Sequence, residues 1–187
     1  MNFILFNSGL LLAFFSTISG CFDFGPNFLI PLPQDNLIEN GSFEEHGLPS
    51  SRNWLGFEDT SRVTFATDVP SGGGKYSARI WSHWITAGTV STAVPADGGY
   101  HIYRLSAFIK SSMPFQRALM DIYIQRDHKI VREKFLFISD TLWTQSSLLD
   151  TVATIPGDTL VVSFTGDYRQ SGWGYTYVDL VSLVKVW

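Results

Sequence analysis

The sequence predicts an all-β fold, an antiparallel β-sandwich of the jelly-roll kind, on three observations. Apolar and polar residues alternate over several short segments, as in strands that bury one face. Glycine, proline and aspartate cluster between these segments and are typical of turns. No window after Gln34 has the apolar spacing of a helix. Many short strands with such turns favour two packed antiparallel sheets.

The clearest alternation lies in ALMDIYIQRD (118–127) and YRLSAFIKS (103–111). Successive side chains of a strand point to opposite faces. In the first segment we expect core positions at Met120, Ile122 and Ile124, and outward positions at Asp121, Tyr123 and Gln125. In the second we expect core positions at Leu105, Ala107 and Ile109, and outward positions at Arg104, Ser106, Phe108 and Lys110.

Four further segments are predicted strands: VREKFLFI (131–138), SSLLDTVAT (146–154), TLVVSFTG (159–166) and YTYVDLVSLVKVW (175–187). In TLVVSFTG the buried positions are Leu160, Val162 and Phe164. The turns between the strands are predicted at PSGGGKYS (70–77), PADGGY (95–100), QRDHK (125–129), IPGD (155–158) and RQSGWG (169–174).

Residues 1–20 are predicted to be an export signal. Phe3 to Ile18 is mostly apolar, too short for a membrane span, and followed by small residues. It departs from the usual pattern because Met1 to Ser8 holds no Lys or Arg. ISGC (18–21) resembles the bacterial lipobox, which implies cleavage before Cys21 and a diacylglyceryl group on its thiol. The alternative is a plain signal peptide that contains a cysteine.

Cys21 is the single cysteine, and lipidation would explain an unpaired thiol in an exported protein. Two acyl chains make membrane anchoring stable. Residues 21–34, with three of the eight prolines, are predicted to form a tether, because proline disfavours helix and central strand alike. The folded domain is then 35–187, and we expect it in the cell envelope, anchored by lipid.

Composition argues against several classes of function. The net charge is −4 and no long basic run occurs, which disfavours nucleic-acid binding. The four histidines are scattered without metal-ligand spacing. Glu44 and Glu45 are adjacent, so on a strand they point to opposite faces and make a poor acid–base pair. No nucleophile elbow, P-loop or HExxH motif is present, and we expect no catalytic residues.

Six motifs in order resemble the carbohydrate-binding modules of families 4, 9 and 22, within the galactose-binding-like jelly rolls. They are NLIENGSFEE (36–45), Trp54, SGGGKYSARI (71–80), VPADGGYHIYRLSAFIKSS (94–112), LWTQ (142–145) and YVDLVSLV (177–184). The resemblance covers nearly all of 36–184. It implies non-catalytic binding of a glycan or polysaccharide, usually as the accessory of a catalytic domain such as a glycoside hydrolase.

The resemblance also implies a structural calcium ion between the first and last strands. It carries the ligand role onto the side chains of Glu44 and Asp179 and onto the backbone carbonyls of Ser42 and Lys75. Calcium takes six to eight oxygen ligands, which suits carboxylates mixed with carbonyls. The chain departs from the family at Leu180, where a second aspartate is common. The alternative is that Glu44 caps a turn and Asp179 pairs with an Arg or Lys.

Sugar rings stack on aromatic side chains and hydrogen-bond to planar polar groups. The outward face of LMDIYIQ has that composition, with Tyr123 between Asp121 and Gln125. We expect Arg104 and Phe108 on a neighbouring strand to extend this face, with Trp84 at its wall. Trp54 and Trp143 match positions that the family uses for packing. The competing hypothesis is an adhesion or structural subunit that binds a protein partner through the same scaffold; a hydrolase ranks third.

Overall fold

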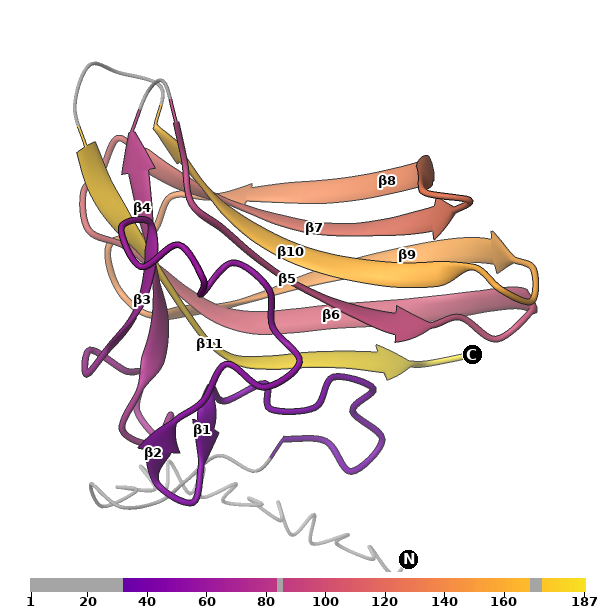
Figure 1. Cartoon of the computed structure of the whole chain (residues 1–187), viewed down its shortest axis with the longest axis horizontal. Coiled ribbons are helices and arrows are strands. Elements are labelled where there is room, and N and C mark those ends of the chain that lie inside the picture. The colour runs from indigo at the N-terminus through magenta and orange to yellow at the C-terminus, as the bar shows by residue number, and fades with distance from the viewer. Residues whose placement is uncertain (1–31, 84–85, 169–172) are drawn as a thin grey trace, which may run out of the picture.

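The computed structural model describes residues 32–83, 86–168 and 173–187. Two antiparallel sheets pack face to face, which confirms the predicted β-sandwich (Figure 1). In spatial order the first sheet holds β3 (Val63–Ala66), β4 (Ser77–His83), β11 (Trp173–Lys185), β6 (Gly99–Ser111) and β9 (Thr144–Thr154). The second holds β5 (Thr89–Pro95), β10 (Thr159–Tyr168), β7 (Gln116–Arg126) and β8 (Lys129–Ile138). A small hairpin, β1 (Glu44–Glu45) with β2 (Leu48–Pro49), precedes them.

Most connections cross between the two sheets, as in a jelly roll. Strand β6 pairs with β11 and β9, whereas the next strand, β7, pairs with β10 and β8 in the other sheet. Within the two large sheets, only β3–β4 and β7–β8 are neighbours both in sequence and in space. Segments that are close in sequence therefore often lie on opposite sides of the molecule.

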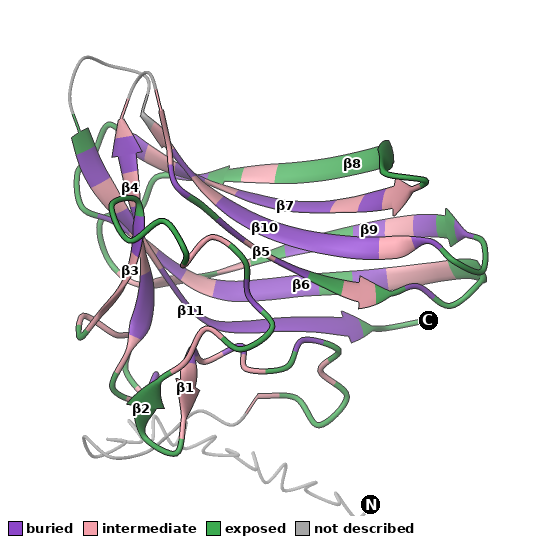
Figure 2. Ribbon diagram, in the orientation of Figure 1, coloured by how far each residue is buried: buried purple, intermediate pink, exposed green. Residues whose placement is uncertain are grey.

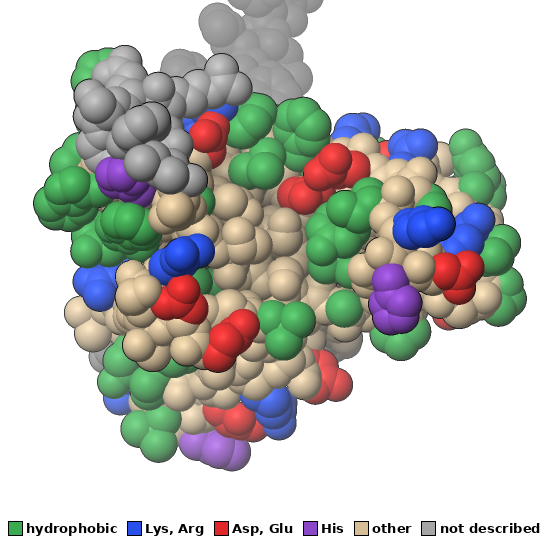
Figure 3. Space-filling model, turned by 45° about the horizontal axis from the view of Figure 1, so that its top comes forward, with side chains coloured by type: hydrophobic (Ala, Val, Ile, Leu, Met, Phe, Trp, Pro, Cys, Tyr) green, Lys and Arg blue, Asp and Glu red, His purple; other side chains and the backbone are tan. Residues whose placement is uncertain are grey.

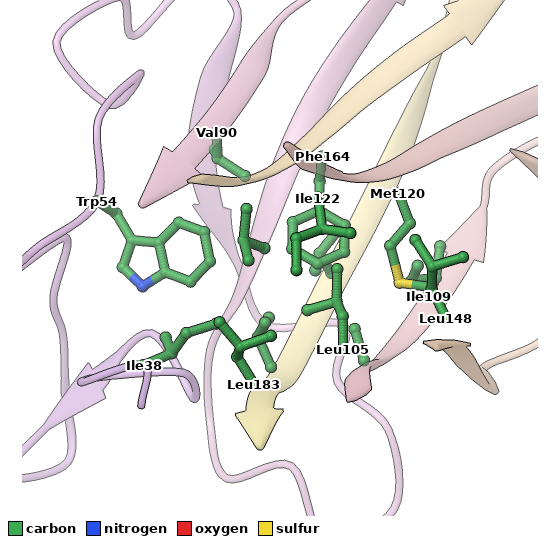
Figure 4. Close-up of a cluster of buried hydrophobic side chains, with 14 of the residues drawn as sticks. Ile38, Trp54, Val90, Leu105, Ile109, Met120, Ile122, Leu148, Phe164 and Leu183 are labelled. Atoms are coloured by element: carbon green, nitrogen blue, oxygen red, sulfur yellow. The ribbon is translucent and has the colours of Figure 1, made fainter. Parts of the chain in front are cut away.

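The predicted alternation is confirmed by burial (Figure 2). The side chains expected to face inward are all at most 2% exposed: Leu105, Ala107, Ile109, Met120, Ile122, Ile124, Leu160, Val162 and Phe164. They meet in one core between the sheets (Figure 4). The edge strand β8 is exposed over most of its length. Burial of these apolar side chains supplies the main driving force for folding.

Trp54 joins this core from the N-terminal segment, as expected from the resemblance. It packs against Phe43, with ring centroids 4.8 Å apart, and against Phe164 at 6.3 Å. Its Nε1 donates a hydrogen bond to the carbonyl of Asn40, so the buried indole leaves no polar group unpaired. Trp143 differs: it is half-buried outside the core, and its Nε1 donates to Asp68.

Two buried aspartates hold the ends of the sandwich through paired hydrogen bonds from arginine. Arg126 at the end of β7 binds Asp158 with N–O distances of 2.7 and 2.8 Å. Arg132 of β8 binds Asp150 of β9 at 3.0 and 2.6 Å and so links the two sheets. The Arg126 hydrogen bonds lower the pKa of Asp158 to about 2, so this carboxylate stays charged at neutral pH.

In the described ranges 32–83, 86–168 and 173–187, no helix is long and apolar enough to span a membrane.

Candidate binding face and metal site

The outer face of the four-stranded sheet carries the central part of the predicted binding site. Tyr123 on β7 lies between Val161 of β10 and Glu133 of β8 in the strand register. Its ring is half-buried, whereas Ile122 and Ile124 on either side are buried in the core. Tyr123 therefore points outward as the alternation predicted. Gln125, two residues on, is half-buried on the same side.

Asp121 lies beside Tyr123 in an unusual environment for a carboxyl group. It is 5% exposed, and its Oδ2 accepts a hydrogen bond of 3.4 Å from Ser163 of β10. Its Oδ1 has no protein donor within the described residues. The neighbouring group is the carboxyl of Glu133, and a hydrogen bond between the two acids requires a proton on one of them, which is then the donor. Burial and Glu133 together raise the pKa of Asp121 to about 7.

Strand β8 adds an apolar ridge along this face. Phe135 lies opposite Asp121, and Phe137 lies opposite Leu119. The two rings meet edge to face with centroids 5.4 Å apart. The Arg117 guanidinium lies 3.8 Å from the centre of the Phe137 ring and pairs with Asp167 on β10. Arg117, Phe137 and Phe135 thus form one border of the face.

Uncharged groups dominate the middle of the face. Ser163, Thr165 and Ser91 project outward from β10 and β5, and Thr89 and Thr165 hydrogen-bond to each other at 2.9 Å. Figure 3 shows a shallow hollow with polar and backbone atoms in its floor and hydrophobic and acidic side chains along its upper edge. A hollow with hydroxyl groups and an aromatic ring is suited to a polyhydroxylated ligand.

The prediction that Arg104 and Phe108 extend this face is wrong. Both lie on β6, which belongs to the five-stranded sheet, so they are on the opposite side of the sandwich from Tyr123. The physical reason is the crossover after β6, which carries the chain to the other sheet. With Gln145 and Leu180 they line a separate hollow of about 390 Å³.

Two other predicted residues, Trp84 and Cys21, lie outside the described residues. The binding role of Tyr123, Asp121 and Gln125 stays a prediction.

The structure adds Glu133, Phe135 and Phe137 to this face, which sequence reasoning missed. Their strand, 131–138, was expected, but its pairing with β7 shifts at Ile124 and Gln125, and no local pattern reveals such a shift.

Asp179, the first predicted calcium ligand, is fully buried on β11. Its Oδ1 accepts a hydrogen bond of 2.7 Å from the Leu180 amide, and its Oδ2 has no partner within the described residues. Burial raises the pKa of Asp179 to about 9, and the Glu44 carboxylate adds to the rise. Within the described residues no Arg or Lys pairs with it, so the alternative of an ion pair for Asp179 is wrong.

A bulge in β11 accompanies this placement. The register with β6 runs from Asp179–Phe108 to Ser182–Ser106, so one extra residue is inserted. Leu180 takes up the bend with φ of 50°, a conformation that leucine rarely adopts. Bulges of this kind often re-aim a side chain at a functional site.

Glu44 lies against the glycine turn of residues 72–74, near Asp179. Its Oε1 accepts hydrogen bonds from the amides of Lys75 and Tyr76, the latter at 2.6 Å, so it caps this turn as the alternative proposed. A Cβ at Gly73 would overlap Asp179 Oδ2, and one at Gly74 would overlap Glu44 Oε2. Only glycine allows the backbone to approach both carboxylates this closely.

The donor set fits calcium in part. It offers one orphaned buried carboxylate oxygen, a second carboxylate and a backbone turn packed against both, which are oxygen ligands of the kind calcium prefers. Within the described residues no group of three or more His, Cys, Asp or Glu side chains is placed to hold a metal ion. Most ligands would therefore be backbone carbonyls or water. The carbonyl roles of Ser42 and Lys75 stay predictions.

The fold is similar to that of solved carbohydrate-binding modules. A family 16 carbohydrate-binding module matches with a TM-score of 0.61 at 19% identity, over 80% of this chain and 99% of the module. A family 61 module solved in complex with β-1,4-galactotriose matches with a TM-score of 0.55 at 14% identity, over 80% of this chain and 98% of the module. The likeness is one of fold. It confirms the expected jelly-roll architecture.

A similar fold also occurs within longer chains. The enzymatically active domain of tailspike protein 4 from bacteriophage CBA120 matches with a TM-score of 0.61 at 18% identity over 81% of this chain. This chain spans only 22% of the length of that solved chain. No protein-family model and no curated protein matches the sequence.

Proposed function

We propose that this domain binds carbohydrate without catalysis, along the outer face of the four-stranded sheet. The observation that carries the proposal is the Tyr123 ring, which is half-buried and faces outward beside the hydroxyl groups of β10 and β5. The ring offers a stacking surface for the C–H face of a sugar, and the hydroxyl groups can donate to and accept from sugar hydroxyls.

Three further features support this function. The groups in the middle of the face are mostly hydroxyls on rigid strands, which hold their geometry before a ligand arrives. Phe135 and Phe137 add apolar surface along one border. The fold likeness to two carbohydrate-binding modules agrees with this function, although a shared fold does not by itself fix the ligand.

Tyr123→Ala should weaken glycan binding roughly three- to tenfold, because aromatic stacking contributes about 0.5–1.5 kcal/mol beyond area burial. The melting temperature should change little, since the ring is outside the core. A glycan array identifies the best oligosaccharide, and calorimetric titration then compares wild type with the variant. Tyr100→Ala is the matched control, because Tyr100 is 63% exposed on β6 of the other sheet. Equal affinities of wild type and Tyr123→Ala would contradict the proposed face.

The ISGC motif supports attachment of this domain to a bacterial membrane through lipid on Cys21. We expect mass spectrometry of the mature N-terminus to show a diacylglyceryl group on Cys21 and no residue before it. Cys21→Ser should move the protein from the membrane fraction to the soluble fraction, because two acyl chains supply the anchoring energy. An unmodified Cys21 or a cleavage site elsewhere would show that the lipobox resemblance misled.

The carboxylates Glu44 and Asp179 support a structural calcium ion as part of the same domain. Their placement between the first hairpin and the last strand lets one ion link the two ends of the folded chain. The chain has a single cysteine, so no internal disulfide supplies such a link. The ion would stabilise the fold by binding only the folded state.

A further inference from the structure

The outer face of the five-stranded sheet carries a second concentration of aromatic side chains. Trp173, Tyr175 and Tyr177 alternate along β11 and so project from one side. Their register partners on β4 are His83, Trp81 and Arg79, respectively. Strands β4 and β11 lie side by side in Figure 1. Together these six side chains form what we call the aromatic row.

The row is continuous. Ring centroids of Trp173 and Tyr175 are 6.0 Å apart, and those of Tyr175 and Tyr177 are 6.4 Å apart. Trp81 and His83 are stacked nearly parallel, 5.4 Å apart and 7° between planes. Trp173 is 55% exposed, so the row is not a covered part of the core. Aromatic rings in contact with solvent on a rigid sheet are typical of a surface that binds ligand.

A hollow of about 390 Å³ lies at the Tyr177 end of the row. Tyr177, Tyr76 and Phe65 supply aromatic walls, and Arg79 and Asp68 supply the charged groups. Its volume is within the roughly 300–1,000 Å³ range of small-molecule sites. The mixture of aromatic and charged walls differs from that of a flat apolar surface, which would suit a protein partner.

Among the described residues, the side chains that line this hollow leave one positive charge, that of Arg79, without a carboxylate partner of its own. Asp68 is already engaged: its Oδ2 accepts a hydrogen bond of 2.6 Å from Lys110, and its Oδ1 accepts one of 2.9 Å from Trp143. Arg79 is held differently. Its Nε donates to Thr64 Oγ1 at 3.0 Å, and its guanidinium lies 4.8 Å from the centre of the Tyr175 ring. With Asp68 neutralised by Lys110, the positive charge of Arg79 remains.

We propose that this hollow is a second saccharide site, which takes a sugar ring that carries a carboxylate. The two terminal nitrogens of Arg79 bind the carboxylate, since arginine presents them as a fork that matches its two oxygens. Tyr177 and Tyr76 contact the ring, and the fixed oxygens of Asp68 accept its hydroxyls. The site is on the opposite sheet from Tyr123, so it does not rest on the proposed function of that face.

The test uses three probes, the trisaccharides of galacturonic, glucuronic and mannuronic acid, each as the free acid and as its methyl ester. The ester keeps the ring and removes the negative charge. Calorimetry on the wild-type domain should show that at least one free acid binds at least tenfold more tightly than its ester. Tyr123→Ala should leave that affinity unchanged, which separates this site from the face proposed above.

Arg79→Gln should weaken binding of the free acid at least tenfold and leave the ester unaffected. Arg79→Lys keeps the charge but loses the forked pair of nitrogens, so its affinity for the free acid should lie between those of wild type and Arg79→Gln. If Arg79→Gln does not fold, the affinity of Arg79→Lys tests the proposal instead. Arg104→Gln is the matched control, because Arg104 lies on the same sheet but lines the other hollow. Lack of binding to all three acids, or equal affinity for acid and ester, would overturn the proposal.

Discussion

Calcium at a concentration about 100 times its dissociation constant should raise the melting temperature of this domain by roughly 5–10 °C. A ligand at that level adds about 2.7 kcal/mol to the free energy of unfolding. For a domain of this size, each kcal/mol corresponds to roughly 2–4 °C. The structural reason is Asp179, a fully buried carboxyl group whose Oδ2 has no partner in the described residues. A bound cation would compensate the cost of its buried charge.

Asp179→Asn should abolish this calcium-dependent rise, because it removes the charge and one ligand oxygen while keeping the side-chain shape. The measurement is a thermal melt in calcium and in chelator for each variant. Glu45→Gln is the matched control: Glu45 follows Glu44 in the same strand, but it pairs with Arg52 at 2.7 Å on the other side. It should keep most of the rise. A wild-type melting temperature that is the same in calcium and in chelator would rule out a stabilising calcium ion.

The fold was predictable because its determinants are local. Alternation in 118–127 is a property of consecutive residues. If this segment forms a strand with one buried face, Met120, Ile122 and Ile124 must lie together on that face. The same pattern assigned Leu105 and Phe164 to the core. Turn residues then set the strand ends. None of this needs knowledge of which strands become neighbours.

The candidate site was only partly predictable because a site depends on neighbours. Tyr123 could be assigned an outward direction, but its sheet partners could not be found from the sequence. Arg104 and Phe108 were placed beside it because their strand is adjacent in sequence, and the crossover after β6 separates them. Glu133 reaches Asp121 through a hairpin whose register shifts by a bulge. Sheet membership and bulges are settled by packing across the whole domain.

The proposed metal site was also only partly predictable. The motif match pointed to Glu44 and Asp179, and the structure brings both against the glycine turn. The absence of a cationic partner for Asp179 among the described residues could not be read from the sequence, because Arg and Lys are distributed along the chain. The lack of a cationic partner in the described part of the chain, more than the identity of the residue, is what makes Asp179 a candidate metal ligand.

Asp121→Asn should remove a pH dependence of stability between about pH 4 and pH 7. An aspartate in an unfolded chain titrates near pH 4. In the folded domain, burial and the adjacent Glu133 carboxyl raise the pKa of Asp121 to about 7. Below pH 4 the group is protonated in both states and costs nothing. As the pH rises toward 7, the unfolded chain releases this proton while the folded domain retains it, so the free energy of unfolding falls.

The fall has an upper limit of about 4 kcal/mol, at 1.36 kcal/mol for each unit of pKa. Urea denaturation of both proteins from pH 4.5 to 7.5 measures it as the difference between wild type and Asp121→Asn, which cancels the other titrating groups. That difference should shift in favour of the variant as pH rises and level off above about pH 7.

Two further variants test what raises the pKa of Asp121. Glu133→Gln should reduce the slope of wild type without abolishing it, because burial is the larger cause of the raised pKa and the Glu133 carboxyl is the second. Asp127→Asn should follow the wild-type profile, since Asp127 is exposed in the turn of the same β7–β8 hairpin. Parallel profiles for wild type and Asp121→Asn would mean that Asp121 ionises freely. Tyr123 would then adjoin an ordinary carboxylate.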